Sequence, residues 1–261
     1  MSKIPPPNYV PAHDLLRGKN VLITAAAGAG IGFATAQRCA EEGARLFISD
    51  IHEKRTGEAA AKLAEISGQP VGHRLCNVRE DADVRALVEA AVSEMGHVDV
   101  VINNAGLGGE VPVVDMSDEQ WTSVLDITLN SVFRMTRAVL PHMTERGSGV
   151  IVNNASVLGW RAQKGQAHYA SAKAGVMAFT RCSALEAAEH GVRINAVSPS
   201  IAVHPFLEKT TPRELLDELE AREAFGRGAE PWEVANVIVF LASDYSSYMT
   251  GEVVSVSSQR A

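Results

Sequence analysis

The stretch Val21-Leu-Ile-Thr24-Ala-Ala-Ala-Gly28-Ala-Gly30-Ile-Gly32 joins an apolar run to three closely spaced glycines. The apolar run predicts a buried strand, and a helical pattern begins directly after the loop. A glycine-rich turn in this place leaves the N–H groups of the helix N-terminus available to a pyrophosphate, and it allows close approach. We therefore expect a dinucleotide-binding turn. An ordinary glycine turn is the alternative, which the position between a strand and a helix disfavours.

Strand-like and helix-like segments alternate along the rest of the chain. Short runs rich in Val and Ile, without clean polar alternation, occupy residues 21–23, 44–49, 70–75, 98–102, 149–153, 192–197 and 251–256. Helical patterns occupy residues 31–42, 53–67, 80–95, 118–144, 167–190 and 231–243. Runs of the first kind are typical of parallel strands buried on both faces. The alternation predicts an α/β protein with a single-domain doubly wound Rossmann fold, a seven-stranded parallel sheet carrying helices on both faces.

Two segments fall outside this rhythm. Residues 1–17 are proline-rich, and we expect an extended or loosely ordered arm before a nucleotide-binding domain over residues 18–261. Residues 204–228 insert a further helical pattern before the helix at 231. Long insertions in compact α/β domains are often lids, so we expect a helical flap over the site. A solvated surface helix is the alternative.

Composition fits an ordinary globular protein and argues against several kinds of partner. Of the 261 residues, 46% are hydrophobic and 21% are charged. The net charge of −7 and the pI near 5.6 provide no basic surplus for nucleic acid. Cys39, Cys76 and Cys182 lie far apart and suggest neither a metal site nor disulfides. The first residues lack an apolar signal segment, and no apolar run reaches about 18 residues, so we expect a cytoplasmic protein without membrane contact.

An acidic residue follows the predicted loop at the distance that a dinucleotide site requires. Asp50 ends the second predicted strand, 18 positions after Gly32, where a carboxylate can accept hydrogen bonds from both ribose hydroxyls of adenosine. The same carboxylate would repel a 2'-phosphate, which predicts NAD over NADP. The neighbouring His52, Lys54 and Arg55 leave room for the opposite preference. The alternative role of Asp50 is that it caps the following helix.

A phenol, an ammonium and a hydroxyl form the candidate catalytic group. Tyr169 and Lys173 lie four residues apart, hence on one face of the helix predicted at 167–190. A phenol titrates near about 10, and an adjacent ammonium should lower its pKa, so that Tyr169 can act as acid or base. Ser156, just beyond the fifth strand, can hold the substrate oxygen beside it. A helix surface pair and a turn serine are the plain alternatives, although the combination after a nucleotide loop is rare.

Together these motifs resemble the short-chain dehydrogenase/reductase family, from Lys19 to about Val256. The remaining residues that carry the resemblance are Asn103-Asn104-Ala105-Gly106 and Asn195-Ala-Val-Ser-Pro199. The resemblance implies an NAD-dependent oxidoreductase acting on CH–OH groups, assembled as a homotetramer or homodimer. It implies that Lys173 also bonds the nicotinamide ribose and that Ile201 holds the carboxamide. The cofactor contacts that we expect are Thr24, Ala27, Gly28, Gly30, Ile31, Asp50, Ile51, Asn77, Val78, Asn104, Ala105, Gly106, Tyr169, Lys173, Pro199 and Ile201.

Two departures from the family pattern concern the catalytic side of the site. The glycine loop is one residue longer than usual and has alanine in place of the first glycine, so the turn must bulge differently. Thr128 stands where the family has an asparagine that anchors a water of the proton relay, while Asn130, two positions on, faces elsewhere. A threonine hydroxyl can still bond a water. We therefore count Thr128 among the catalytic residues and expect an altered relay in a working enzyme.

Two further departures concern the cofactor. Ser200 replaces a glycine after Pro199, and His204 stands where a threonine commonly contacts the cofactor. His204 is therefore expected to touch pyrophosphate or substrate, with a plain surface histidine as the alternative. Asn77 stands where an aspartate often meets adenine, and an amide can form hydrogen bonds there as well.

The substrate pocket should form from the loop after Ser156 and from the flap. Trp160 and Phe206 suggest a broad apolar substrate, and Arg161 could meet an anionic handle such as a CoA phosphate, although exposed cations are more often plain surface. Longer phrases, such as NNASVLGWRAQ, resemble family members of actinobacterial steroid degradation. That implies a hydroxylated methylhexahydroindanone propanoyl-CoA as substrate. A 3-oxoacyl-thioester reductase and a non-catalytic nucleotide-sensing protein on the same fold are the alternatives.

Overall fold

The computed structural model describes residues 3–258, except for the side chains of Phe206, Lys209 and Thr210. Its described part contains one sheet of seven parallel strands in the order β3-β2-β1-β4-β5-β6-β7. The strands are β1 Asn20–Ile23, β2 Arg45–Asp50, β3 Gly72–Leu75, β4 Val100–Asn103, β5 Gly149–Asn154, β6 Val192–Pro199 and β7 Val253–Val256. The order reverses between β1 and β4, and this is the point where α/β sheets open a ligand crevice at their carboxyl edge. The Rossmann fold expected from the sequence is confirmed.

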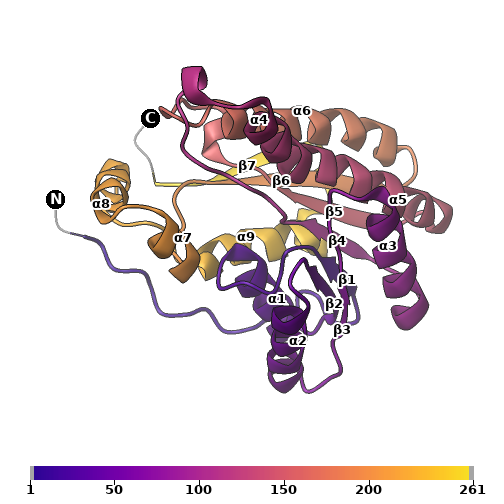
Figure 1. Ribbon diagram of the computed structural model, residues 1–261. Coiled ribbons are helices and arrows are strands. Elements are labelled where there is room, and N and C mark those ends of the chain that lie inside the picture. The colour runs from indigo at the N-terminus through magenta and orange to yellow at the C-terminus, as the bar shows by residue number, and fades with distance from the viewer. Residues whose placement is uncertain (1–2, 259–261) are drawn as a thin grey trace.

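Helices cover both faces of the sheet (Figure 1). They are α1 Ile31–Glu41, α2 Glu53–Ser67, α3 Asp81–Met95, α4 Asp118–Leu125, α5 Ser131–Arg146, α6 Ala167–Ala188, α7 Pro205–Thr210, α8 Arg213–Arg222 and α9 Pro231–Ala242. The apolar faces of α1, α2 and α9 pack into one core with the strands, and those of α3, α5 and α6 pack into the other. The two cores fix the sheet, and so the carboxyl edge, between rigid layers.

Burial follows the position of each strand in the sheet. All four residues of β1 and of β4 are buried, as expected for strands covered on both faces. The edge strands differ from that expectation, because β3 exposes three of its four residues and β7 is only partly buried. β3 lies at the edge of the sheet and its sequence is Gly-His-Arg-Leu, so its polar side chains face solvent where the strand has only one neighbour.

The helix predicted at 118–144 is interrupted in the structure. A capping box between Ser117 and Gln120 begins α4, and a π-helical turn at Asp126–Asn130 separates α4 from α5. Turns of this kind are rare and are frequently found at functional sites. Thr128 lies in the middle of it and is fully buried.

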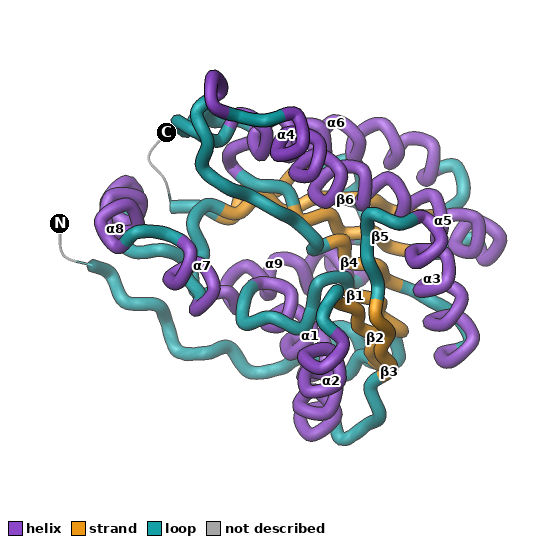
Figure 2. Tube along the Cα trace, in the orientation of Figure 1, coloured by secondary structure: helices purple, strands orange, loops and turns teal. Residues whose placement is uncertain are grey.

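The two unusual segments of the sequence lie on the flank of the sheet. Residues 3–14 form an extended arm without regular secondary structure, and residues 204–228 contain α7 and α8 (Figure 2). An isolated bridge between Ala202 and Ala229 joins the two ends of this insertion. The helical character expected for the insertion is confirmed. No helix in the described part of the chain combines the length and apolarity needed to cross a membrane.

Candidate active site

The glycine loop after β1 has the open helix N-terminus that the sequence predicts. Gly30 is the N-cap of α1, and no side chain caps the helix there, so its first N–H groups are available to an anion. A Cβ on Gly32 would lie 2.2 Å from the Ala25 carbonyl oxygen, so only glycine fits at that position. Ala25 itself adopts a left-handed backbone with φ of 52°. The expected different turn is thus visible as a strained alanine at the start of the loop.

Thr24 and Asn104 connect the glycine loop to the turn after β4. The Thr24 hydroxyl accepts hydrogen bonds from the N–H groups of Asn104, at 3.0 Å, and Ala105, at 3.3 Å. The Asn104 amide donates to the Ala25 carbonyl at 3.1 Å and accepts from Asn154 at 2.9 Å. Since Thr24 is only 1% exposed, it holds the crevice together rather than lining it.

The residues expected at the adenosine end lie at the carboxyl ends of β2 and β3, or just after them, and these two strands are paired. Asp50 accepts from the Ala27 N–H at 3.2 Å and from the His52 N–H at 3.3 Å, which fixes its carboxylate beside the glycine loop. Asn77 accepts from the Arg79 N–H at 3.2 Å. Ile51 is 58% exposed, while Val78 packs against the second core. These residues share the same edge of the sheet as the loop.

The structure brings Ser156, Tyr169 and Lys173 together at the carboxyl edge of β5. Ser156 lies just after β5, where its hydroxyl accepts from the Leu158 N–H at 3.2 Å, and a hydrogen bond from Ser156 acts on the Tyr169 phenol. The Lys173 ammonium is 5.5 Å from the centre of the Tyr169 ring and donates to the Asn154 carbonyl at 2.5 Å. A Cβ on Gly106 would lie 3.5 Å from Lys173 Nζ, so glycine keeps the space beside the ammonium open.

The electrostatics of this group differ from the expectation that Lys173 lowers the tyrosine pKa. Burial raises the pKa of Tyr169 to about 12, and the hydrogen bond from Ser156 offsets only part of that effect. Burial also lowers the pKa of Lys173 to about 7. Lys173 is only 2% exposed, so the same burial that raises the tyrosine pKa also disfavours the charged form of the lysine. The expected lowering of the Tyr169 pKa by Lys173 is therefore not found, and the shift caused by burial favours the protonated phenol.

The Thr128 side chain forms hydrogen bonds with the backbone of Leu107 and does not point into the crevice. Its hydroxyl accepts from the Leu107 N–H at 3.0 Å and donates to the Leu107 carbonyl at 3.1 Å. Both bonds fasten the segment after Gly106 to the π-helical turn. Asn130, as expected, faces elsewhere and donates to Asp126 at 3.1 Å.

The segment after β6 reaches back to the glycine loop. A Cβ on Gly30 would lie 3.4 Å from the imidazole of His204, so this histidine lies against the loop and not at a remote surface. Pro199 is buried at the end of β6, and the Ile201 carbonyl accepts from the Ala229 N–H at 2.8 Å. Ser200 donates its N–H to Val256 at 3.1 Å.

The residues expected at the substrate lie at the rim of this region. Trp160 is 51% exposed and Arg161 is exposed, on the loop that follows Ser156. The side chain of Phe206 lies outside the described part of the structure. Sequence reasoning did not single out Asn154, whose carbonyl and amide bond Lys173 and Asn104. Its place at the carboxyl end of a buried strand, beside Ser156, was the available signal.

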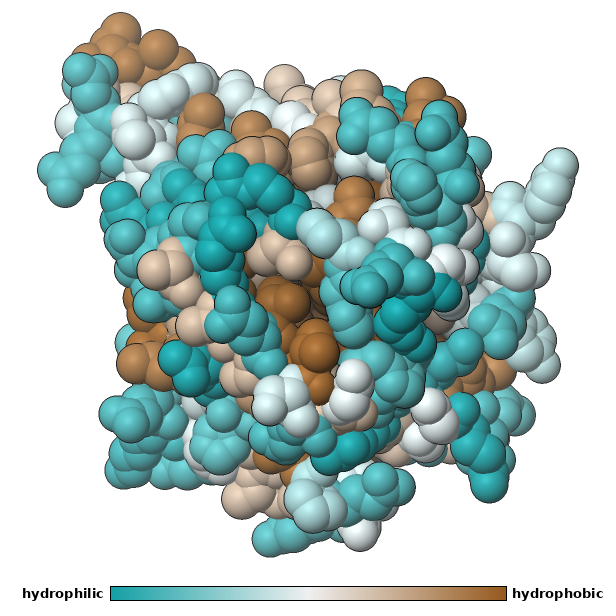
Figure 3. Space-filling model, turned by 90° about the vertical axis from the view of Figure 1, so that its right-hand side faces the viewer, coloured by the Kyte–Doolittle hydropathy of each residue, from teal (hydrophilic) through white to brown (hydrophobic). Residues whose placement is uncertain are grey.

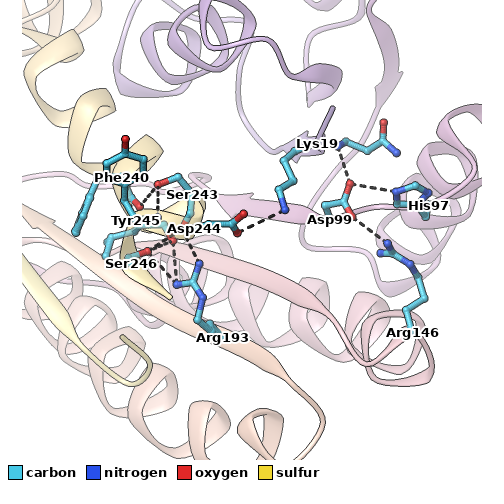
Figure 4. Close-up of polar contacts among 12 residues, drawn as sticks. Lys19, His97, Asp99, Arg146, Arg193, Phe240, Ser243, Asp244, Tyr245 and Ser246 are labelled. Atoms are coloured by element: carbon cyan, nitrogen blue, oxygen red, sulfur yellow. Dashed lines mark hydrogen bonds and ion pairs between the residues drawn. The ribbon is translucent and has the colours of Figure 1, made fainter. Parts of the chain in front are cut away.

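A large hollow lies at the opposite, amino edge of the sheet. Figure 3 shows it as an apolar depression with a hydrophilic rim, and it measures about 600 Å³. Asp99 on its wall accepts from Arg146 at 3.0 Å and from the Asn20 N–H at 2.9 Å, and Arg193 donates to the Ser243 and Leu241 carbonyls (Figure 4). The charged groups of Asp99 and Arg193 thus find their hydrogen-bond partners within the protein. None of the predicted site residues lines this hollow.

Fold and site together define a class of protein. Over residues 25–258 the chain matches the family described as enoyl-(acyl carrier protein) reductase. The chain belongs to the short-chain dehydrogenase/reductase family, and it is a nicotinamide-dependent oxidoreductase acting on CH–OH groups.

Particular relatives narrow the class. The chain is 62% identical over 254 residues, 97% of each protein, to the (5R,7aS)-5-hydroxy-7a-methyl-1-oxo-2,3,5,6,7,7a-hexahydro-1H-indene-carboxyl-CoA reductase of Mycobacterium tuberculosis. It is 40% identical to a 3-oxoacyl-[acyl-carrier-protein] reductase of Thermotoga maritima, covering 92% of this chain and 97% of that one. A crystal structure of a short chain dehydrogenase from Mycobacterium smegmatis superposes with a TM-score of 0.87 at 58% identity, covering 98% of each chain.

Proposed function

We propose that this protein interconverts a secondary alcohol and a ketone on a bicyclic, steroid-derived CoA thioester, with NAD as cofactor. The observation that carries the proposal is the convergence of Ser156, Tyr169 and Lys173 at the carboxyl edge, in a chain 62% identical to an indene-carboxyl-CoA reductase. The loop at Gly28–Gly30, with its uncapped helix, and the open space beside Lys173 fit a dinucleotide that spans the edge.

Each of the three side chains has a separate task. A bound nicotinamide supplies the hydride donor or acceptor. Ser156 holds the substrate oxygen next to the Tyr169 hydroxyl, so that the oxygen is placed before any proton moves. The Tyr169 phenol, protonated at neutral pH because burial raises its pKa, gives its proton to the oxygen of a ketone during reduction. In the reverse direction the tyrosine must first lose that proton, so alcohol oxidation is favoured by alkaline pH.

Lys173 supports proton transfer by Tyr169 through its positive charge. Its ammonium lies 5.5 Å from the centre of the phenol ring and donates to the Asn154 carbonyl, so it is the nearby source of positive charge when the proton leaves Tyr169. We also assign it to the nicotinamide ribose, next to Gly106. Thr128 is assigned a positioning role, because both of its hydrogen bonds go to Leu107 rather than to the reacting groups.

We infer NAD as the preferred dinucleotide from Asp50. The backbone N–H groups of Ala27 and His52 hold its carboxylate at the adenosine end. A carboxylate there accepts hydrogen bonds from ribose hydroxyls and repels a 2'-phosphate. Asp50→Ala should therefore narrow the gap between NAD and NADP by about tenfold in kcat/KM, which corresponds to the loss of one charge-assisted hydrogen bond. An unchanged gap would mean that another residue selects the cofactor.

For the substrate we assign Trp160 and Phe206 to the ring system and Arg161 to the CoA part. Trp160 is half exposed beside Ser156, which provides a broad apolar wall for a fused ring. A guanidinium is well suited to bind a phosphate. The similarity to 3-oxoacyl-[acyl-carrier-protein] reductases at 40% identity supports a second candidate substrate, a linear 3-oxoacyl thioester.

A spectrophotometric assay tests the proposal. Purified protein is given NAD or NADP with the hydroxylated indanone CoA thioester, the free acid of the same ring system, and 3-hydroxybutyryl-CoA. We expect the absorbance of NADH to appear with the bicyclic thioester and little of it with the other two compounds. Preference for the linear thioester would select the second candidate. Calorimetric binding of NADH without turnover of any compound would favour a nucleotide sensor on the same fold.

We further propose that the protein works in the cytoplasm as a homotetramer or homodimer, with residues 1–17 as arm, 18–261 as the nucleotide-binding domain and 204–228 as flap. The position of β7 at the edge of the sheet, and the exposure of Tyr245 and Tyr248 in the segment that leads to it, support an interface between copies. Light scattering of the purified protein checks the assembly.

A further inference from the structure

The N-terminal arm connects two parts of the molecule that are far apart in sequence. It begins beside α8 and runs along the outside of the sheet layers to α1 (Figures 1 and 2). Because the arm has no regular secondary structure of its own, its position depends on the contacts that its side chains and backbone make with the rest of the protein. Those contacts fall into an inner anchor on α1 and an outer anchor at the flap.

The inner anchor is a buried ion pair on α1. Arg38, 4% exposed, pairs with Glu42, fully buried, at 2.5 Å. The Arg38 guanidinium also donates to the Val10 carbonyl at 2.8 Å, and Glu42 accepts from the His13 N–H at 2.9 Å. Two buried charges are costly unless hydrogen bonds offset their loss of water, and here the arm backbone supplies hydrogen bonds to both of them, although Arg38 Nε has no hydrogen-bond partner among the described residues. The arm is therefore docked, not loose.

An aromatic contact continues the inner anchor towards the flap. The Tyr9 ring lies 5.5 Å from the Arg38 guanidinium and packs edge-on against Trp232 of α9 at 5.2 Å. Its hydroxyl donates to Glu41 at 2.6 Å. Tyr9 thus joins the arm to α1 and to the first turn of α9 at once.

The outer anchor grips the segment that returns from α8 to α9. The Ile4 N–H donates to the Phe225 carbonyl at 2.9 Å, and Arg227 donates to the Ile4 carbonyl at 2.8 Å. Arg227 also makes two bonds, of 2.6 and 2.9 Å, to Glu233 at the start of α9. Lys3 forms an ion pair with Glu220 of α8. Residues 223–227, which lead from α8 back to α9, are called the stalk here. Both backbone groups of Ile4 in the arm are thus hydrogen-bonded to this stalk.

The other side of the stalk is held by the chain after β7. Glu223, 2% exposed, accepts from the Ser258 N–H at 3.1 Å and hydroxyl at 3.0 Å, and the Ala224 N–H donates to Ser258 at 2.6 Å. Residues 223–227 are therefore clamped between the arm and the C-terminal segment. At its far end, the insertion places His204 against Gly30 of the phosphate loop.

We propose that the arm is a positioning element of the substrate site: Ile4 and Arg227 hold the returning stalk and so set the position of α7 and α8 over Ser156 and Tyr169. This rests on the proposed function, in which residues 204–228 cover the substrate. A flap fixed at its stalk presents one shape to a bulky bicyclic acceptor, and a released flap loses that pre-organisation. The effect falls on KM for large substrates and leaves the chemistry of small ones unchanged.

The matched pair Ile4→Pro and Ile4→Val tests the proposal. Proline removes the single N–H that bonds Phe225 and suits an extended backbone, whereas valine keeps the N–H. We expect trypsin to cleave α8 after Arg213 and Arg222 roughly fivefold faster in Ile4→Pro, with Ile4→Val at the wild-type rate. KM for the bicyclic thioester should rise about as much, while kcat for a small cyclic alcohol stays within about twofold.

A chain lacking residues 2–8 keeps the inner anchor and should show larger changes of the same kind. If both Ile4→Pro and the shortened chain keep the wild-type cleavage rate and KM, the arm does not position the flap. Should the shortened chain fail to fold, the comparison of Ile4→Pro with Ile4→Val is sufficient to test the proposal. The cleavage rate needs no substrate, so faster cleavage in a protein that ignores the bicyclic thioester would refute the proposed substrate and uphold the role of the arm.

Discussion

The two edges of the sheet differ in whether the ionisable side chains are stabilised in their charged or in their neutral forms. At the amino edge, beside the large hollow, the burial of Asp99 would raise its pKa, but the Asn20 N–H, Arg146 and His97 hold that pKa below the usual range. At the carboxyl edge, burial dominates, and Tyr169 and Lys173 are both shifted towards their neutral forms. Satisfied charges stabilise a fold, and shifted ones are prepared for chemistry. The size of a hollow is therefore a poorer guide to function here than the state of its ionisable groups.

The largest effect should come from Lys173→Met, which separates activity from stability. Removing the cation should lower kcat about 100-fold or more, as expected for loss of a group that supports proton transfer. Stability should rise by about 0.5–2 kcal/mol, because the folded state no longer buries an ammonium. Steady-state kinetics and urea denaturation measure the two quantities.

The pH dependence of that gain follows from the lowered pKa of Lys173, about 7 when folded against 10.5 in its ordinary state. Below pH 7 the folded protein carries the full cost of the buried charge, so the gain is largest there. Between about 7 and 10.5 the folded chain has released a proton that the unfolded chain retains, so wild-type stability rises and the gain fades. A variant less stable than wild type at pH 6 would show that the ammonium is a stabilising group.

Thr128→Val tests whether the segment after Gly106 depends on the π-helical turn. The substitution leaves the Leu107 N–H and carbonyl without the hydroxyl that bonds both. We expect kcat to fall about tenfold through misplacement of the crevice wall, with little change in the pH profile. Thr128→Ser keeps the hydroxyl and should behave like wild type. Equal loss in both variants would argue for a role of the methyl group.

At the amino edge, Asp99→Ala should affect stability alone. The loss of its bonds to Arg146 and the Asn20 N–H should cost about 1–3 kcal/mol, with kcat unchanged. Since its folded pKa lies below the unfolded value, this contribution is present above about pH 4 and disappears as the pH falls through the folded value. Thermal melts of both proteins between pH 3 and 7 measure it. A kinetic defect would connect the hollow to function.

The sequence predicted the layers better than the energetics. Strand runs such as Val21–Ile23 and the spacing of Tyr169 and Lys173 are local patterns, and the alternation of strands with helices predicts a parallel sheet without giving the order of its strands. The raised pKa of Tyr169 was not predictable, because it depends on burial by segments distant in sequence. The expectation that β3 is buried was wrong, and here the sequence held a local signal, because the strand contains His73 and Arg74. The docking of the arm depends on Arg38 and Glu42, which look like an ordinary helical pair until their burial is known.

The smallest effect concerns the loop at the start of the crevice. Ala25 has a left-handed backbone, so Ala25→Gly should stabilise the fold by about 0.5–1 kcal/mol, the strain relieved less the entropy that glycine loses. KM for NAD should stay unchanged, because Gly28 and Gly30 keep their places. Differential scanning calorimetry with and without NAD detects the shift. A destabilised variant would mean that the methyl group packs favourably there.

The central claim is that the Tyr169 phenol moves the proton at the carboxyl edge. Its most direct test is the pH profile of kcat/KM for alcohol oxidation, measured for wild type and Tyr169→Phe. Because the phenol is protonated in the free protein, wild-type kcat/KM should rise towards alkaline pH, whereas the variant should be flat and lower by about 100-fold or more. A variant with near-wild-type turnover and the same rising profile would contradict the account.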